Sequence, residues 1–301
     1  MPNISFFIPA YNCAETIAES VASIMETNFK IGDELIIVND CSSDNTAEVL
    51  LNIKDKYPVI QTLIHKRNKG GGAARNTAIE SATNDLLFCL DSDNILEKNS
   101  IKPLKSHLLN SDADIASFQE MRYFSSDNKH DTQYIWHFPP VVSMADFMAD
   151  HKNPGSSGNY LFTKKSWREA EGYPEFAGSL DTWGFCFRQL AAGSKLVTLP
   201  GSYYFHRYGG DSYYIRDMNS RNMSLAALQI ILPYYHIFHP EDFNYIMSNE
   251  NRMNWFENFD SRPIRILGGQ VGLKSISVNA AQPKPNAGLA KKIYYRLRNK
   301  R

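Results

Sequence analysis

The first 90 residues alternate between strand-like apolar runs and stretches with the apolar spacing of helices. The strand-like runs are residues 4–8, 34–38, 59–64 and 86–90, and the helical stretches are residues 14–25, 47–53 and 73–82. This rhythm predicts an α/β fold in which a parallel sheet with right-handed crossovers carries helices on its faces. Ligands of such sheets bind at the carboxyl ends of the strands, so the polar residues after each strand are the first candidates for a site.

Composition excludes several classes of protein. Lysine and arginine together number 32, as do aspartate and glutamate, whereas a nucleic-acid binder needs a strongly basic face. No apolar run reaches the roughly 18 residues of a transmembrane helix, and residues 1–3 lead into the first strand without a signal peptide. The four cysteines form no C-x-x-C pair, so we expect reduced thiols and neither disulfides nor a zinc site. These features predict a cytoplasmic protein without a nucleic-acid partner.

The chain divides by pattern into three parts. We expect residues 1–112 and 113–215 to form two halves of one domain, because the β-α rhythm ends near residue 112. Residues 216–301 are expected to form a mainly helical extension that includes an amphipathic helix over residues 217–232.

Three local features are also predicted within the two halves. The first helix is expected to begin at Asn12, whose side chain can cap it, with Glu15 at the capping-box position. Residues 121–140 read as a long irregular connection, and residues 153–158 as a mobile loop.

Asp91-Ser92-Asp93 directly follows the fourth predicted strand. Extended backbone would aim the two carboxylates to opposite sides, so a turn must begin here if both are to face one site. Such a pair offers the hard oxygen ligands that Mg²⁺ or Mn²⁺ prefers, with diphosphate oxygens and water completing an octahedron. The alternative is a capped turn between strand and helix.

Asp40 ends the second predicted strand. It can cap the next helix together with Ser42, Ser43 and Asp44, or it can accept the N–H of a pyrimidine ring with Tyr11 as a stacking surface. Residue types alone favour the cap.

A glycine-rich turn at residues 70–72 precedes the helix at residues 73–82. Backbone N–H groups at such a helix start can face a phosphate, which makes Gly70 a candidate contact, although the spacing is not that of a P-loop. Arg75 lies one turn into the helix, where it can reach the same ligand or brace Asp91.

Asp181 precedes another predicted helix and would cap it. It also follows a glycine-containing approach at residues 171–178, a loop of the kind that presents a carboxylate to a ligand. A carboxylate in hydrogen-bond reach of an acceptor hydroxyl can act as a general base, typically worth about 10²–10⁴-fold in rate. His206 and Arg207 lie in an aromatic strand, where His206 is either a packed core residue or, beside the arginine, a metal or diphosphate contact.

Taken together, these segments resemble glycosyltransferase family 2, inverting enzymes with the GT-A fold. The matching stretches cover about residues 3–215 and comprise residues 7–12, 38–46, 65–76, 91–93 and 171–173 with Asp181. The resemblance implies a mostly parallel central sheet flanked by helices, with residues 1–112 binding the nucleotide and residues 113–215 the acceptor. The sequence departs from the family pattern at Asn39, Cys41 and Leu180.

The resemblance also implies individual roles. Nucleotide-base contacts would come from Pro9, Tyr11 and Asp40, ribose and diphosphate contacts from Arg75 and Asp91, the metal contact from Asp93, and the general base would be Asp181. Further candidates from the patterns above are Gly70, Ser92 and Arg207 for the donor, and Asp91 and His206 for the metal.

The sequence thus predicts an inverting, metal-assisted transfer of a sugar from a nucleotide-diphosphate donor, expected to be UDP-linked, to a hydroxyl of a glycan or lipid-linked acceptor. Mn²⁺ or Mg²⁺ is the expected cofactor, and polysaccharide biosynthesis of the cell envelope the expected setting. A sugar nucleotidyltransferase would need a glycine-rich, arginine-containing turn where residues 9–12 stand. The other alternative, a sugar-nucleotide-binding protein without transferase activity, is disfavoured by Asp93 and Asp181.

The last 13 residues, 289–301, combine apolar and basic side chains at helical spacing. This tail is either a solvated basic helix or a peripheral contact with the inner face of the cell membrane. The second interpretation suits a lipid-linked acceptor.

Overall fold

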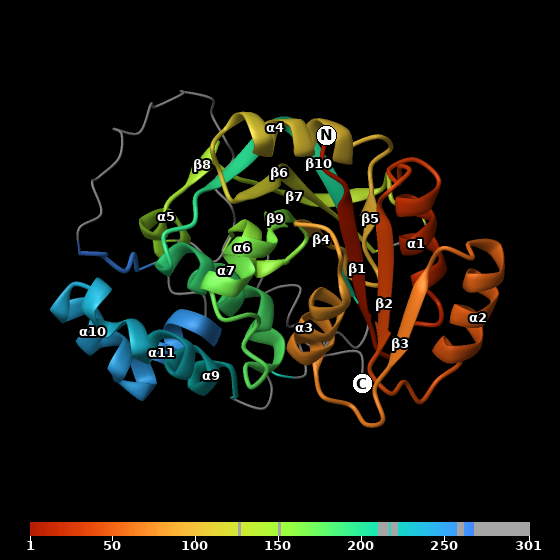
Figure 1. Ribbon diagram of the computed structural model, residues 1–301. Helices are drawn as coiled ribbons and strands as arrows, with labels where there is room; N and C mark the ends of the chain where they lie inside the picture. Colours follow the sequence, from red (N-terminus) through yellow and green to blue (C-terminus); the bar gives the residue numbers. More distant parts are fainter. Residues whose placement is uncertain (126–127, 150–151, 210–216, 218–221, 258–261, 268–301) are drawn as a thin grey trace. The chain divides into compact units, whose positions relative to one another are not determined.

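The computed structural model describes residues 1–125, 128–149, 152–209, 217, 222–257 and 262–267. Residues Met1–Gly268 form one compact unit. Within the described residues, a mixed sheet of ten strands lies at the centre of this unit (Figure 1). Its strands follow the order β3-β2-β1-β4-β9-β6-β10-β5, with β7 paired to β6 and β8 to β10.

The first four strands form the parallel part that the sequence predicts. They are β1 (Ile4–Ala10), β2 (Glu34–Asn39), β3 (Gln61–Ile64) and β4 (Leu86–Cys89). The remaining strands are β5 (Ile95–Leu96), β6 (Ile115–Phe124), β7 (Thr132–His137), β8 (Val141–Val142), β9 (Leu161–Thr163) and β10 (Leu196–Arg207). Strand β9 pairs antiparallel with both β4 and β6, so it joins the two predicted halves into one sheet.

Helices cover both faces of the sheet (Figure 1). One face packs against α1 (Ile17–Met25), α2 (Thr46–Lys56) and α4 (Ile101–Asn110). The other packs against α3 (Gly71–Ser81), α5 (Met144–Ala149), α6 (Lys164–Glu169), α7 (Asp181–Ala191) and α9 (Asn222–Ile231). Successive side chains of β1 point to alternate faces, so Phe6 and Ile8 enter the first core and Phe7 the second.

Shorter elements complete the described chain. They are the 3₁₀ helices η1 (Pro154–Ser156), η2 (Gly178–Leu180) and η3 (Leu232–Ile237), and the helices α10 (Pro240–Met247) and α11 (Asn249–Glu257). Helix α9 occupies part of the helix predicted over residues 217–232. The basic tail at residues 289–301 lies outside the described residues. Within them, no helix has the length and apolarity that crossing a membrane requires.

The prediction that the first helix begins at Asn12 is wrong. Helix α1 begins at Ile17, and Asn12 adopts a φ of 48°, in the left-handed region that asparagine tolerates. Asn12 Oδ1 accepts a hydrogen bond from the backbone N–H of Ser43 at 2.8 Å. Asn12 therefore ties the loop after β1 to the loop after β2 and caps no helix.

Residues 121–140 do not form an irregular connection. Strand β6 continues to Phe124, and β7 runs back antiparallel beside it. Tyr134 and Trp136 alternate along β7 with more exposed residues, and Tyr123 of β6 stacks on Tyr134 with ring centroids 4.1 Å apart. This alternation of burial is that of a strand, but the sequence does not show it as apolar and polar alternation, because the exposed residue between Tyr134 and Trp136 is Ile135.

The predicted mobile loop at residues 153–158 contains η1, and five of its six residues are buried. Asn153 caps η1, accepting a hydrogen bond from the backbone N–H of Ser156 at 3.2 Å. A buried, capped turn thus stands where polar and glycine residues had suggested a surface loop.

Candidate active site

Asp40 and Asp91 lie at the same edge of the sheet. In the parallel register Asn39 of β2 stands beside Ala10 of β1, and Cys89 of β4 beside Phe7. Asp40 follows β2 directly, and Asp91 follows β4 after one residue. The carboxyl edge of the parallel strands therefore carries both acids, as the β-α rhythm predicted.

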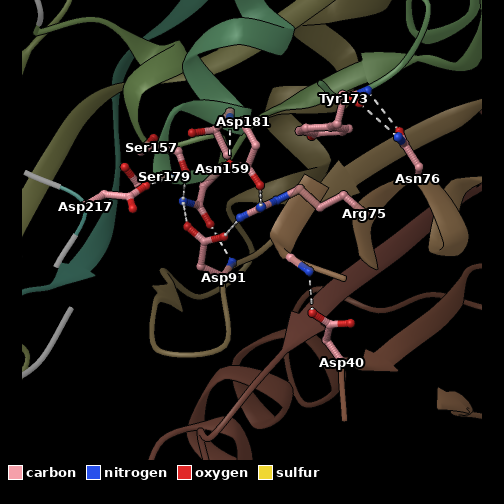
Figure 2. Close-up of polar contacts among 12 residues, drawn as sticks. Asp40, Arg75, Asn76, Asp91, Ser157, Asn159, Tyr173, Ser179, Asp181 and Asp217 are labelled. Carbon is pink, nitrogen blue, oxygen red and sulfur yellow. Dashed lines mark hydrogen bonds and ion pairs between the residues drawn. The ribbon is translucent and has the colours of Figure 1, made fainter. Parts of the chain in front are cut away.

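Arg75 of α3 connects Asp91 with Asp181 (Figure 2). Its Nη1 donates a hydrogen bond to Asp181 Oδ2 at 2.5 Å, and its Nη2 donates to Asp91 Oδ1 at 2.7 Å. Arg75 and Asp181 are buried, and the Asp91 side chain is partly exposed. One guanidinium thus joins the acid of the D-x-D turn to the acid predicted to be the general base.

The charges of Arg75, Asp91 and Asp181 affect the pKa values of Arg75 and Asp181. Burial raises the pKa of Asp181, although Arg75 acts in the opposite direction. Burial alone would lower the pKa of Arg75, but Asp181 and Asp91 outweigh it and raise that pKa. Arg75 is therefore protonated. Its single positive charge interacts with the carboxylates of both Asp181 and Asp91.

Asn159 bonds the carboxylate oxygen of Asp91 that Arg75 leaves, Oδ2, while Arg75 bonds Oδ1 (Figure 2). Asn159 is fully buried, and its side chain bonds both the backbone N–H and the carboxylate of Asp91. Sequence reasoning missed this residue, because a buried asparagine in a loop has neither periodicity nor a motif around it.

Asp93 differs from Asp91 in its surroundings. Within the described part of the chain, the carboxylate of this half-buried residue accepts no hydrogen bond from another residue, while its backbone C=O accepts one from Arg207 Nε at 3.2 Å. Burial and the neighbouring Asp91 carboxylate raise the pKa of Asp93 to about 7. Ser92, between the two acids, interacts with the thiol of Cys13.

His206 lies near the D-x-D turn but is linked to it through Asn94. Asn94 Oδ1 accepts the backbone N–H of Arg207 at 3.0 Å, which fixes its amide so that Nδ2 faces His206 Nδ1 at 3.2 Å. His206 Nδ1 is then the acceptor, and Nε2 carries the ring proton. Burial lowers the pKa of His206 to about 4, so the ring is neutral at pH 7.

The candidate metal ligands Asp91, Asp93 and His206 therefore have different partners. Asp91 is engaged by Arg75 and Asn159, and His206 by Asn94. No group of three or more His, Cys, Asp or Glu side chains converges as a metal-binding set in the described ranges. Asp93 is the one of the three candidates whose carboxylate is bonded to no other residue there.

Arg207, a candidate for the diphosphate, also lies beside the D-x-D turn. Its Nη2 donates to Glu19 of α1 at 2.6 Å, and its Nε to the backbone of Asp93. Arg207 is the last residue of β10, and its side chain is thus held between α1 and the acidic turn that follows β4.

Asp40 fixes the turn that leads into α3 through hydrogen bonds. Its carboxylate contacts His65 Nδ1 at 2.6 Å and accepts the backbone N–H groups of Lys69 at 2.9 Å and Gly70 at 2.8 Å. Asp40 does not cap α2; Asp44 accepts the N–H of Thr46 there. The favoured interpretation of Asp40 as a cap is therefore wrong.

The predicted nucleotide-base contacts lie at this same edge. The backbone N–H of Asp40 donates to Ala10 O at 2.8 Å, which places Asp40 beside the residues flanking Ala10, Pro9 and Tyr11. Tyr11 is 42% exposed, so its ring is available to a ligand.

The start of α3 packs closely against the segment that carries Asp181. A Cβ on Gly72 would lie 3.1 Å from Pro174 O and 3.4 Å from Asp181 Cβ. Asn76 holds the same segment, since it exchanges hydrogen bonds with the backbone O and N of Tyr173 at 3.0 and 2.9 Å. Asn76, like its neighbour Arg75, therefore holds a segment that is distant from α3 in the sequence.

The fold is that of the GT-A glycosyltransferases. Residues 1–349 of TarS from S. aureus superpose with a TM-score of 0.58 at 18% identity, covering 86% of this chain and 73% of that one. The mannosyltransferase PcManGT from Pyrobaculum calidifontis superposes with a TM-score of 0.57 at 15% identity, covering 86% and 71%. At these identities the likeness establishes the fold alone.

The sequence model of glycosyl transferase family 2 matches residues 5–170, more than half of the chain. The chain therefore belongs to glycosyl transferase family 2. Relatives include the poly-beta-1,6-N-acetyl-D-glucosamine synthase of Staphylococcus aureus, 34% identical over 33% of this chain and 24% of that protein. Glycosyltransferase GlyG of Streptococcus pneumoniae is 32% identical over 41% of each chain. The matches thus span less than half the length of these relatives.

Proposed function

We propose that the chain transfers a sugar, with inversion, from a nucleotide-diphosphate donor to a hydroxyl of a glycan or lipid-linked acceptor, assisted by Mn²⁺ or Mg²⁺. The observation that carries this proposal is the bridge from Asp91 through Arg75 to Asp181. It brings the acidic turn expected to bind the donor within one side chain's reach of the acid expected to activate the acceptor.

Two observations on similar proteins support a UDP-linked donor and a glycan acceptor. TarS, which shares the fold, has been crystallised with UDP and with UDP-GlcNAc, and one relative is a poly-beta-1,6-N-acetyl-D-glucosamine synthase. In the proposal, Pro9, Tyr11 and Asp40 contact the nucleotide base within residues 1–112. The acceptor is bound by residues 113–215.

The side chains at the acidic turn carry the charge that suits a divalent cation. Asp91, Asp93 and Asp181 lie near two arginines, Arg75 and Arg207. Arg207 also pairs with Glu19, so an excess of negative charge remains. We propose that Asp93 holds the metal, because its carboxylate is bonded to no other described residue, with diphosphate oxygens as further ligands. PcManGT, which shares the fold, has been solved in complex with GDP-Man and Mn²⁺. A bound cation would offset the charge that develops on the departing diphosphate.

Asp181 is proposed to accept the proton of the acceptor hydroxyl. Its Oδ2 accepts from Arg75, and its Oδ1 accepts the N–H of Thr182 at 2.7 Å. A carboxylate has about four lone-pair sites, so each oxygen keeps one free for a hydroxyl. The two fixed hydrogen bonds orient the carboxylate at the start of α7, and its burial excludes competing water.

The location proposed for the enzyme is the cytoplasm, at the inner face of the cell membrane, in cell-envelope polysaccharide synthesis. The basic residues at 289–301 would provide the peripheral contact. Liposome binding by the full chain that exceeds binding by a chain ending at Pro285 would support this location, and equal binding would contradict it.

The activity is tested by screening nucleotide sugars for turnover with Mn²⁺ or Mg²⁺, using variants of the two acids. Asp181→Asn should keep donor affinity and lose at least about 10²-fold in turnover. Asp93→Ala should lose the metal-dependent part of UDP binding measured by calorimetry. Asp112→Asn is the matched control, because Asp112 is exposed and paired with Lys195 away from these residues.

Two results would contradict the proposal. Unchanged turnover in Asp181→Asn would exclude it as the base, and wild-type UDP affinity with Mn²⁺ in Asp93→Ala would exclude it as the metal ligand. Donor binding by the wild type without turnover on any acceptor would favour the alternative, a sugar-nucleotide-binding protein.

A further inference from the structure

We infer that Arg75 is a positioning residue that keeps the buried Asp181 ionised and oriented as a base, and that Asp91 opposes it by sharing the same guanidinium. The inference deepens the proposed function and rests on the proposed role of Asp181. It assigns Arg75 a task that is separate from contacting the donor.

The geometry leaves Asp181 dependent on Arg75. Among the described residues, Asp181 is held by two donors, Arg75 Nη1 and the backbone N–H of Thr182. Thr182 is the next residue of α7, so Arg75 is the partner that comes from another element. The backbone at the start of α3 lies close to this pair: a Cβ on Gly71 would be 2.6 Å from Arg75 Nη1 and 2.7 Å from Asp181 Oδ2.

Arg75 has no cationic substitute in this group. Among the described residues its buried Nε has no hydrogen-bond partner, and its two carboxylate contacts are made by its Nη atoms. In the described part of the chain, the titratable groups that act on Asp181 are Arg75 of α3, Cys89 at the end of β4, Asp91 after it, and Tyr173 before η2. Asp217 contacts the segment before Asp181, where it accepts the N–H of Ser179 at 2.7 Å (Figure 2). The single positive charge among them is that of Arg75.

The charges predict shifts of opposite sign. A base must be ionised before it accepts a proton, and burial raises the pKa of Asp181, which works against this state. Arg75 lowers that pKa and Asp91 raises it. Removing the charge of Arg75 should therefore raise the pKa of Asp181, and removing the charge of Asp91 should lower it. A residue that only supports the fold would not give this pair of signs.

The test compares the pH dependence of kcat for the wild type, Arg75→Lys, Arg75→Met and Asp91→Asn at saturating donor. In Arg75→Met the acid limb should move to higher pH by about one to three units, the usual effect of losing an opposite charge at this range. Arg75→Lys should show a smaller shift, because an ammonium keeps the charge but cannot span both carboxylates. Asp91→Asn should move the limb to lower pH.

A second measurement does not depend on turnover. The carboxyl resonance of Asp181, identified by its loss in Asp181→Asn, can be titrated by NMR in the full chain. Arg75→Lys keeps a cation in the buried site, so it serves if Arg75→Met does not fold. Its Asp181 titration should lie above that of the wild type, and that of Asp91→Asn below.

The outcomes separate this inference from the proposed function. Shifts of the same sign in the Arg75 and Asp91 variants, or unshifted titration of Asp181, would overturn the inference while leaving the transferase proposal intact. Full turnover in Asp181→Asn would instead overturn the base assignment. Opposite shifts without turnover by the wild type would retain the electrostatic role of Arg75 and reject the catalytic one.

Discussion

Asp91 and Asn159 hold each other through a reciprocal pair of hydrogen bonds. The backbone N–H of Asp91 donates to Asn159 Oδ1 at 2.7 Å, and Asn159 Nδ2 donates back to Asp91 Oδ2 at 3.0 Å (Figure 2). Asn159 Nδ2 also donates to Ser157 O at 2.7 Å, so its orientation is set by the loop that carries it. Since Arg75 occupies Asp91 Oδ1, both carboxylate oxygens of Asp91 are engaged by protein. The D-x-D turn is thereby fixed at the side chain of its first acid, whereas the carboxylate of its second acid, Asp93, accepts no hydrogen bond from another described residue.

The first prediction concerns Asn159→Ala. The change leaves the N–H of Asp91 without its partner, and we expect a loss of about 1–3 kcal/mol in the free energy of unfolding. It also frees the turn before Asp93, so donor affinity in the presence of Mn²⁺ should fall. Denaturant unfolding and calorimetry with UDP measure the two effects.

Asn153→Ala provides the matched control. Asn153 is buried in the same segment and caps η1, but it makes no contact with Asp91 among its hydrogen bonds with described residues. It should lose stability and keep donor affinity. If Asn159→Ala also kept donor affinity, the reciprocal pair would be structural and irrelevant to the site.

The second prediction concerns the stability cost of Asp93. Its pKa is about 7 in the folded chain, compared with an ordinary value of 3.8, because burial and Asp91 disfavour its charge. The folded state therefore binds the carboxyl proton of Asp93 more tightly than the unfolded state does. This tighter proton binding adds to the free energy of unfolding. The contribution is fully present below pH 3.8 and is lost as the pH rises through about 7. Asp93→Asn should thus raise the melting temperature at pH 8.5 by roughly 2–4 °C and change it little near pH 4.

Thermal unfolding in the presence of a chelator measures this gain. Asp112→Asn should show no gain at pH 8.5, because Lys195 lowers the pKa of Asp112 and so favours its charge. Addition of Mn²⁺ and UDP should stabilise the wild type and leave Asp93→Asn unchanged. An Asp93→Asn protein that melts at or below the wild-type temperature at pH 8.5 would contradict the account.

Strand periodicity and residue order sufficed to predict where the acids of the site would lie. A parallel strand places the residue after its last apolar position at one edge of the sheet, which is why Asp40 and Asp91 could be placed together. The helix start at Asp181 was also predictable, since the apolar spacing of α7 begins there.

The partners of these acids were not predictable in the same way. Asn159 and His65 act through a few hydrogen bonds to residues distant in sequence, and such bonds leave no periodic trace in the sequence. Asn12 satisfies a capping pattern, yet tertiary contacts with the loop after β2 give it another conformation. Local patterns place the strand ends, whereas the long-range contacts at those ends depend on packing between elements distant in sequence.

The third prediction concerns Gly71, the first residue of α3. Alanine is favoured over glycine in helices by up to about 1 kcal/mol, so Gly71→Ala should not weaken the helix itself. The added Cβ would meet Arg75 Nη1 at 2.6 Å and Asp181 Oδ2 at 2.7 Å, closer than a carbon atom can approach either, so the ion pair must move apart. A displacement of this kind at the base should lower turnover by at least about tenfold, with a smaller effect on donor affinity.

Gly193→Ala is the control, because Gly193 has a φ of 93° but nothing within 4 Å of an added Cβ, so the substitution strains the backbone without touching Arg75 or Asp181. Steady-state kinetics should therefore show a lower kcat in Gly71→Ala and a wild-type kcat in Gly193→Ala. Wild-type turnover in Gly71→Ala would mean that the close contact of Arg75 with Asp181 is not needed for the reaction.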